Sequence, residues 1–209
     1  MKMNRMGQAA AVCFWVLTGC ASTGDRVEIA IPSAATQGST TGAQTANGLK
    51  VAVEVFDDGR TDRSHLGTRL HFWGSTSHFD VQKGTVGEAV AKGIVQQLNK
   101  RGWQASLAGQ AGASRPDATI SGNIQDLSLS AVSRFGRTEI TAKNAMLVRV
   151  ANHSDESSIQ ERVFGSANNE VFWFDPKDAE QLVNELVERN IEKFIADTKV
   201  EGQAVRLRE

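Results

Sequence analysis

Between residues 117 and 174, apolar side chains recur at every second position along three successive segments of the chain. The middle segment has the longest alternation, which comprises Thr138, Ile140, Ala142, Asn144, Met146, Val148 and Val150. The first segment changes parity near Gln125 and Asp126, which predicts a β-bulge at that point. Turns around Gly136 and between residues 152 and 158 separate the segments. This pattern predicts an antiparallel meander with one buried face and one solvated face.

Two amphipathic helices are predicted on either side of the meander. Thr85 and Glu88 form a Thr-x-x-Glu capping box at the start of the first helix, which extends to Arg101. Asp175 caps the second helix, and Pro176 occupies its first position. The apolar stripe of the second helix follows the period of 3.6 residues and consists of Ala179, Leu182, Val183, Leu186, Val187, Ile191, Phe194 and Ile195.

A valine-rich segment from Lys50 to Phe56 predicts a buried strand ahead of the first helix. The expected element order is therefore β-α-β-β-β-α. This order predicts an α+β fold, with a mainly antiparallel sheet and both helices packed on one face of it. We expect a single domain over residues 49–199, followed by a charged, frayed C-terminal tail over residues 200–209.

The N-terminal residues have the pattern of an export signal. Two cations precede an apolar run from Ala9 to Leu17, which is about nine residues long, against the roughly 20 that a membrane-spanning helix needs. The following Leu17, Thr18, Gly19 and Cys20 resemble the lipobox of bacterial lipoproteins, in which the cysteine is acylated and the signal is removed before it. We therefore expect residues 1–19 to be a lipoprotein signal peptide and Cys20 to be a lipidation site.

The mature chain expected from this cleavage limits the possible chemistry. Removal of Lys2 and Arg5 with the signal leaves 21 Lys and Arg against 24 Asp and Glu, a net charge near −3. This balance, with no basic patch in the sequence, argues against nucleic-acid binding. Cys13 lies in the signal and Cys20 is the expected attachment point, so the folded part has no thiol for a disulfide, a nucleophile or a metal site.

Residues 20–48 are rich in Ser, Thr, Gly, Ala and Gln, which predicts a lipidated cysteine followed by a flexible tether. A coil of this length has an r.m.s. reach of roughly 30 Å. Val27, Ile29 and Ile31 alternate with polar residues, and this predicts a short edge strand within the tether. Ala21 stands where an aspartate retains enteric lipoproteins in the inner membrane, which favours the outer membrane, facing the periplasm.

Five segments form a set: the V-E-V strand before D-D-G-R-T-D-R, the helix closing on N-K-R-G-W, the strand D-A-T-I-S-G-N-I, the strand I-T-A-K-N-A-M-L-V-R-V and the helix beginning D-P-K-D-A. Together they resemble the YajG-like family of small bacterial lipoproteins. More loosely, the chain is similar to the auxiliary lipoproteins of ABC-type lipid transport. The resemblance implies a fold and an envelope location but no activity. The chain departs from the family in the insert from His65 to Phe79.

This insert belongs to a segment, residues 61–83, that contains three of the four histidines and an exposed-looking aromatic set of Phe72, Trp73 and Phe79. Two short strands are predicted to pair there over a turn at Gly74. Clustered exposed aromatic residues are frequent anchors of interfaces. We therefore select His71, Phe72 and Trp73 as candidate partner-binding residues.

An alternative is an enzyme or a metal-binding protein that uses the region from Asp57 to His78. The histidine spacings of six and seven residues match no compact zinc pattern. Asp57 and Asp62 are a possible acid and base pair, but Arg60 and Arg63 lie among them, which favours ordinary ion pairs in a turn. We therefore expect no metal, cofactor or catalytic residue. The favoured function is a lipid-anchored, non-catalytic module that binds another envelope protein or complex.

Overall fold

The computed structural model describes residues 24–31, 48–109 and 115–208. Cys20 and the predicted signal peptide lie outside the described residues. Within these ranges the elements follow the order β1 (Asp25–Ile29), β2 (Lys50–Val53), β3 (Asp57–Asp58), β4 (Gly67–Leu70), β5 (Thr76–Val81), α1 (Val86–Lys100), β6 (Gln104–Leu107), β7 (Ala118–Arg134), β8 (Arg137–Asn152), β9 (Ser158–Val171), α2 (Pro176–Ala196), β10 (Thr198–Glu201) and β11 (Ala204–Leu207). Two helices and a mixed sheet in the described chain confirm the α+β class.

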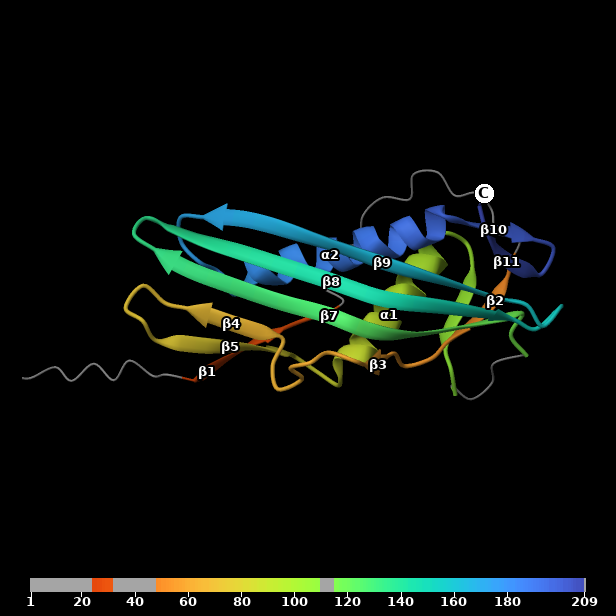
Figure 1. Cartoon of the computed structure of the whole chain (residues 1–209), viewed down its shortest axis with the longest axis horizontal. Coiled ribbons are helices and arrows are strands. Elements are labelled where there is room, and N and C mark those ends of the chain that lie inside the picture. Colours follow the sequence, from red (N-terminus) through yellow and green to blue (C-terminus); the bar gives the residue numbers. More distant parts are fainter. Residues whose placement is uncertain (1–23, 32–47, 110–114, 209) are drawn as a thin grey trace, which may run out of the picture.

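The long strand β7 organises a nine-stranded sheet in the described part of the chain (Figure 1). Along one edge of β7, the short strands β2, β3 and β4 pair with it in succession, each in parallel orientation. Along its other edge, β7 pairs antiparallel with β8, which in turn pairs antiparallel with β9. Beyond β4, the sheet continues through β5, antiparallel to β4, to β1, parallel to β5. Strand β6 forms the edge beside β2.

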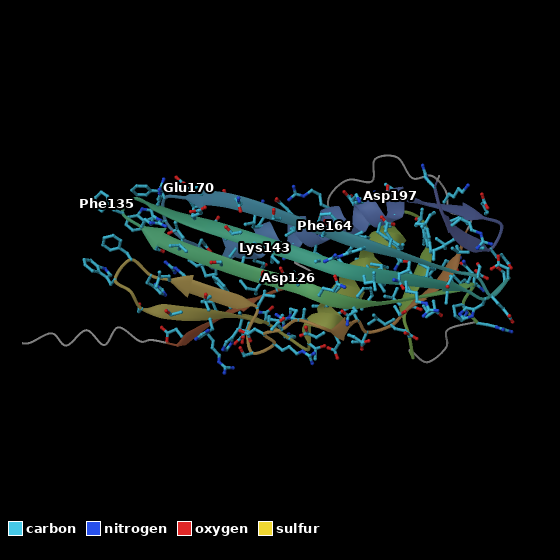
Figure 2. All side chains as sticks on the ribbon, in the orientation of Figure 1. Asp126, Phe135, Lys143, Phe164, Glu170 and Asp197 are labelled. Carbon is cyan, nitrogen blue, oxygen red and sulfur yellow. The ribbon has the colours of Figure 1, made fainter. Side chains whose placement is uncertain are left out.

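The predicted meander is confirmed in β7, β8 and β9. The pairing of β7 with β8 changes register between Ile124 and Asp126, where the change of parity predicted a bulge. The inward side chains of β8 are buried at Thr138, Ile140, Ala142, Asn144, Met146, Val148, Val150 and Asn152. Lys143, on the opposite face of β8, is exposed (Figure 2). The sheet therefore has one dry face and one wet face at the meander.

Both predicted helices form with their predicted caps. The Thr85 side chain accepts a hydrogen bond from the Glu88 amide, and the capping box is complete. Asp175 caps α2 in the same way, with Pro176 as the first helical residue. In Figure 1 both helices lie behind the long strands of the sheet, and Gln97 of α1 donates a hydrogen bond to Glu188 of α2. Neither helix in the described residues is long and apolar enough to cross a membrane.

The order of elements differs from the expected β-α-β-β-β-α. Among the described residues, five strands rather than one precede α1, and β6 separates α1 from the meander. Of the added strands, β1 and the paired strands β4 and β5 were expected from the sequence, whereas β3 and β6, with two and four residues, are too short for a periodic pattern to stand out. Because β2, β3 and β4 run parallel to β7, the sheet is mixed rather than mainly antiparallel at this edge.

The expected tether over residues 20–48 is interrupted by the edge strand, as β1 pairs with β5 along its whole length. Ile29 is fully buried, and Ile31 is 7% exposed. The Asn184 side chain of α2 donates a hydrogen bond to the Ala30 carbonyl at 2.8 Å, and the Ala30 amide donates to Glu180 Oε2 at 3.0 Å. Residues 24–31 therefore belong to the folded domain and not to a free tether.

The C-terminal segment that we expected to be a frayed tail is a hairpin of β10 and β11. Val205 is 1% exposed. The Val205 amide donates to Asn152 Oδ1 at 2.8 Å, and Asn152 Nδ2 donates to the Val205 carbonyl at 3.0 Å. The prediction of fraying was wrong because this buried side-chain amide satisfies a backbone donor and acceptor of β11. The folded domain thus extends past residue 199, to Leu207.

Candidate functional site

Exposed aromatic side chains gather at one end of the sheet. They come from three connections: the β4–β5 turn, the β7–β8 turn and the link between β9 and α2. We call these residues the aromatic end; they are Phe72, Trp73, Phe135, Phe172 and Trp173. Phe135 is seen at the left end of the molecule in Figure 2, beyond the last residues of the long strands.

Strand register explains why these three connections lie together. Leu70, the last residue of β4, pairs with Val132 near the end of β7. Arg134 and Arg137 then pair across the β7–β8 turn. Near the start of β8, Thr138 pairs with Val171, the last residue of β9. Three connections that are far apart in the sequence therefore lie at the same end of the sheet, where these strands begin or finish.

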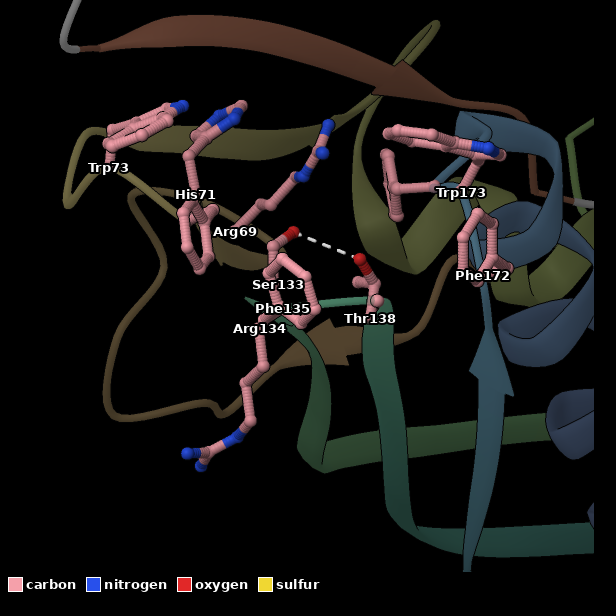
Figure 3. Close-up of a pocket in the computed structure, with 12 residues that line it drawn as sticks. Arg69, His71, Trp73, Ser133, Arg134, Phe135, Thr138, Phe172 and Trp173 are labelled. Carbon is pink, nitrogen blue, oxygen red and sulfur yellow. Dashed lines mark hydrogen bonds between the residues drawn. The ribbon is translucent and has the colours of Figure 1, made fainter.

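The rings of the aromatic end are unusually accessible to solvent. Phe135 is 91% exposed, Trp73 is 87% exposed and Trp173 is 81% exposed. Phe72 packs edge-on against Trp73 with ring centroids 4.8 Å apart, and it lies 6.4 Å from the Phe135 ring. A hollow of about 510 Å³ lies among the three connections (Figure 3). Contiguous exposed apolar surface of this kind marks an interaction site more often than an ordinary surface.

Polar groups line the inner part of this hollow. The Arg69 guanidinium lies over the Phe174 ring, 3.9 Å from its centroid, a cation–π geometry. Arg69 Nε is buried and has no hydrogen-bond partner in the described residues. His71 Nε2 is 2.6 Å from Ser77 Oγ. Burial, followed by the charge of Arg69, lowers the pKa of His71, so the neutral imidazole is favoured.

The three candidate binding residues lie together in the structure. His71, Phe72 and Trp73 all line the hollow, with Phe72 and Trp73 exposed and His71 half-buried against Ser77. Phe79, which the sequence placed in the same exposed set, is fully buried and packs near Phe174, with ring centroids 6.1 Å apart. That expectation was wrong because Phe79 lies within β5, with its side chain on the buried face of the sheet.

Sequence reasoning missed Phe135, Phe172 and Trp173. Each was visible in the chain, Phe135 beside the predicted turn at Gly136 and the other two just before the helix cap. The third strand of the meander was expected to continue to Phe174, but β9 ends at Val171, so the following aromatic residues lie outside the sheet. An aromatic residue next to a turn or a cap was the available signal.

The histidines of the alternative site have structural contacts. His65 and His78 are stacked, with ring centroids 4.1 Å apart, and His65 Nδ1 lies 2.8 Å from Asp80 Oδ1. His71 contacts Ser77 at the aromatic end instead. Among the residues that the structure describes, no three His, Asp or Glu side chains are grouped so as to hold a metal ion.

The charged residues around Asp57 support the turn rather than an open site. Arg60 is 6% exposed and donates two hydrogen bonds to the Asp58 carboxylate, each at 2.9 Å. It also donates to the His65 carbonyl at 3.0 Å and to the Leu127 carbonyl at 3.3 Å. The hydrogen bond from Arg60 lowers the pKa of Asp58. Arg60 therefore holds the loop against β7. The sequence analysis had predicted only an ordinary ion pair in a turn for this arginine.

No family model matches the chain, and no curated protein matches it. Among solved structures, it is similar to protein XCC0632 of Xanthomonas campestris, of the family DUF330, with 8% identity, a TM-score of 0.46, and coverage of 70% of this chain and 81% of that one. The PelC dodecamer from Paraburkholderia phytofirmans has 12% identity, a TM-score of 0.39, and coverage of 71% and 92%. Lipoprotein GNA1162 from Neisseria meningitidis has 12% identity, a TM-score of 0.37, and coverage of 71% and 99%. At these identities and TM-scores the likenesses carry no argument about function.

Proposed function

We propose that this protein is a lipid-anchored protein of the bacterial envelope that acts as a non-catalytic binding or accessory module. Acyl chains on Cys20 hold it to the outer membrane, on the periplasmic side. The lipobox and Ala21 support this location. The aromatic end is the binding surface, and its five exposed rings are the observation that carries the proposal.

The energetic argument concerns the cost of exposing these rings. A Phe or Trp side chain buries roughly 150–250 Å² when it is covered, and each Å² of apolar surface removed from water contributes about 25 cal/mol. Trp73, Phe135 and Trp173 are each more than four-fifths exposed, so folding covers little of their area. Their large apolar surface remains for another molecule to cover, which is how aromatic anchors stabilise interfaces.

The anchor is tested by Cys20→Ala. We expect the wild-type protein to fractionate with membranes and to carry acyl mass on its N-terminal cysteine. The variant should enter the soluble periplasmic fraction or accumulate as an unprocessed precursor. An intact-mass measurement that finds no acyl group on the wild type would refute the anchor.

The binding surface is tested by a photoreactive residue placed at Phe135 in intact cells. Phe164 provides the matched control, because it is 66% exposed but lies on the wet face of β9, away from the aromatic end (Figure 2). We expect an adduct from position 135, with either a lipid or a protein, and none from position 164. Equal labelling from both positions, or none from either, would show that the aromatic end is not a binding surface.

A further inference from the structure

The aromatic end and the start of the described chain lie at the same end of the molecule. Strand β1 runs parallel to β5, and Asp25 pairs with Ser77. The Gly24 amide donates a hydrogen bond to the Thr76 carbonyl at 2.8 Å. Thr76 is the first residue of β5, directly after the turn that holds Phe72 and Trp73. Figure 1 shows this arrangement, with β1 beginning at the same end of the sheet at which β4 and β7 finish.

This placement limits the distance from the aromatic end to the lipid. Cys20 precedes Gly24 by four residues, and four peptide units span at most about 14 Å when fully extended. Because β1 and β5 are parallel, the chain before Gly24 starts from the side on which the β4–β5 turn extends beyond Thr76. The exposed rings of that turn therefore lie on the side of the domain that the anchor holds closest to the membrane.

We propose that the aromatic end docks on the interfacial region of the bilayer that holds the Cys20 acyl chains. This inference rests on the proposed acylation of Cys20. The bound molecule is the lipid surface itself, into which Trp73, Phe135 and Trp173 insert. The domain then stands with its long strands rising from the membrane.

The chemistry of the aromatic end suits a lipid interface. Tryptophan is enriched at the boundary between headgroups and acyl chains because its ring is apolar and its N–H needs a polar partner. Arg134 and Arg137 flank the turn that presents Phe135, and both are exposed. Arg137 also forms an ion pair with Glu170, with 3.6 Å between Arg137 Nη1 and Glu170 Oε2. Arginines beside inserted rings place positive charge at the level of anionic lipid headgroups.

The available space favours lipid over a protein partner at this surface. A helix with its side chains is about 10–12 Å in diameter, which is close to the largest distance of about 14 Å between Gly24 and Cys20. A protein bound to the aromatic end would have to fit into this gap between the domain and the bilayer. Lipid already lies there and offers both apolar and polar groups. A protein partner is therefore the competing outcome of the test.

Tryptophan fluorescence tests this proposal without added labels. Trp15 leaves with the proposed signal, so the mature protein has Trp73, Trp103 and Trp173. Trp103 is 7% exposed and follows α1, next to β6, which pairs at the opposite end of the sheet. The acylated full-length mature protein is reconstituted into vesicles of phosphatidylethanolamine and phosphatidylglycerol, with or without bromine on the upper acyl carbons.

The variant Trp103→Phe reports on the aromatic end alone, and we expect brominated lipid to lower its fluorescence relative to vesicles without bromine, because interfacial tryptophans lie near the upper acyl carbons. The double variant Trp73→Phe and Trp173→Phe leaves only Trp103 and should be unaffected. Conservative changes at two exposed positions keep the fold, which circular dichroism checks.

Vesicle-bound Trp103→Phe protein with no quenching would overturn the proposal while leaving the lipid anchor intact. If Trp73 and Trp173 are not quenched and position 135 forms an adduct with a protein in cells, the surface binds a protein partner. That result would overturn the proposal. Absence of acyl mass together with absence of vesicle binding would instead refute the proposed function. The two failures are therefore distinguishable.

Discussion

The backbone amide of Gly24 donates a hydrogen bond to the carbonyl of Thr76, 52 positions later in the sequence, at 2.8 Å. This bond begins the parallel pairing of β1 with β5. It places the entry of the chain into the domain beside the turn that carries Phe72 and Trp73. A segment that composition alone assigns to a flexible tether therefore orients the domain relative to its proposed anchor.

The double change Phe72→Ala and Trp73→Ala should separate binding from stability. Both side chains are exposed, and substitutions at such positions change the free energy of unfolding by about 0.5 kcal/mol or less each. We expect the melting temperature to stay within a few degrees and the adduct formed from position 135 to be lost. The control Phe164→Ala should alter neither. A variant that melts at a much lower temperature yet still forms the adduct would show that these rings stabilise the fold and do not bind.

Leu186→Ala should strongly destabilise the domain. Leu186 is 2% exposed, and its Cδ1 lies 3.1 Å from the position that a Cβ would occupy at Gly165 of β9. Removal of a buried leucine side chain costs about 2 to 5 kcal/mol. Arg189→Ala, on the exposed face of the same helix, should shift the denaturant midpoint only slightly. A difference below about 0.5 kcal/mol between the two variants would show that α2 does not pack on the sheet.

Two glycines of α1 should respond in opposite ways to alanine. At Gly93 the nearest atom to an added Cβ is Ile191 Cδ1 at 3.8 Å, an ordinary contact, so Gly93→Ala should stabilise the helix by up to about 1 kcal/mol. At Gly87 an added Cβ would lie 2.0 Å from the Phe56 carbonyl oxygen. Gly87→Ala should therefore cost about 1 to 3 kcal/mol through backbone displacement. Thermal unfolding of both variants checks the prediction, which two shifts of the same sign would contradict.

Glu161→Gln should stabilise the protein at neutral pH. Burial, followed by the nearby negative charge of Asp197, raises the pKa of Glu161 above its ordinary value of 4.5. The folded state therefore binds this proton more tightly than the unfolded state does. The resulting stability is fully present below pH 4.5 and is lost as the pH rises through the raised folded pKa. At pH 7 the wild type thus has a partly buried charge near Asp197 that the glutamine variant avoids.

The expected result is a higher melting temperature for Glu161→Gln than for wild type at pH 7, and a much smaller difference at pH 4. Glu139→Gln is the control, because Glu139 is exposed on β8. Its melting temperature should follow that of the wild type at both pH values. A stability gain for Glu161→Gln that is equal at both pH values would contradict an electrostatic origin.

Several elements followed from local patterns in the sequence. Alternation of apolar residues predicted the meander and its bulge near Gln125, because each side of a long strand meets one environment along its whole length. Capping residues predicted the starts of both helices, because a cap depends only on residues within one turn. The lipobox at Cys20 likewise stands on four adjacent residues and stays a prediction, since it lies outside the described residues.

The aromatic end was only half visible from the sequence. The clustering of Phe72 with Trp73 could be read from their adjacency, whereas Phe135 and Trp173 are far away in the chain. Phe135 differs locally from Phe164 in lying beside the turn at Gly136, but this does not show which distant residues lie near it. Only the register between strands decides which of them lies beside Trp73.

Contacts between distant residues also place the C-terminal hairpin of β10 and β11 and the first described residue, Gly24. Val205 packs in the core, and Asn152, 53 residues earlier, forms hydrogen bonds with both its backbone amide and its carbonyl. Gly24 is placed by Thr76 through strand pairing. The sequence by itself determined the two helices and the long strands of the meander, since those patterns arise within a few neighbouring residues. The tertiary structure alone decided which ends meet, because hydrogen bonds between strands join residues that no local pattern connects.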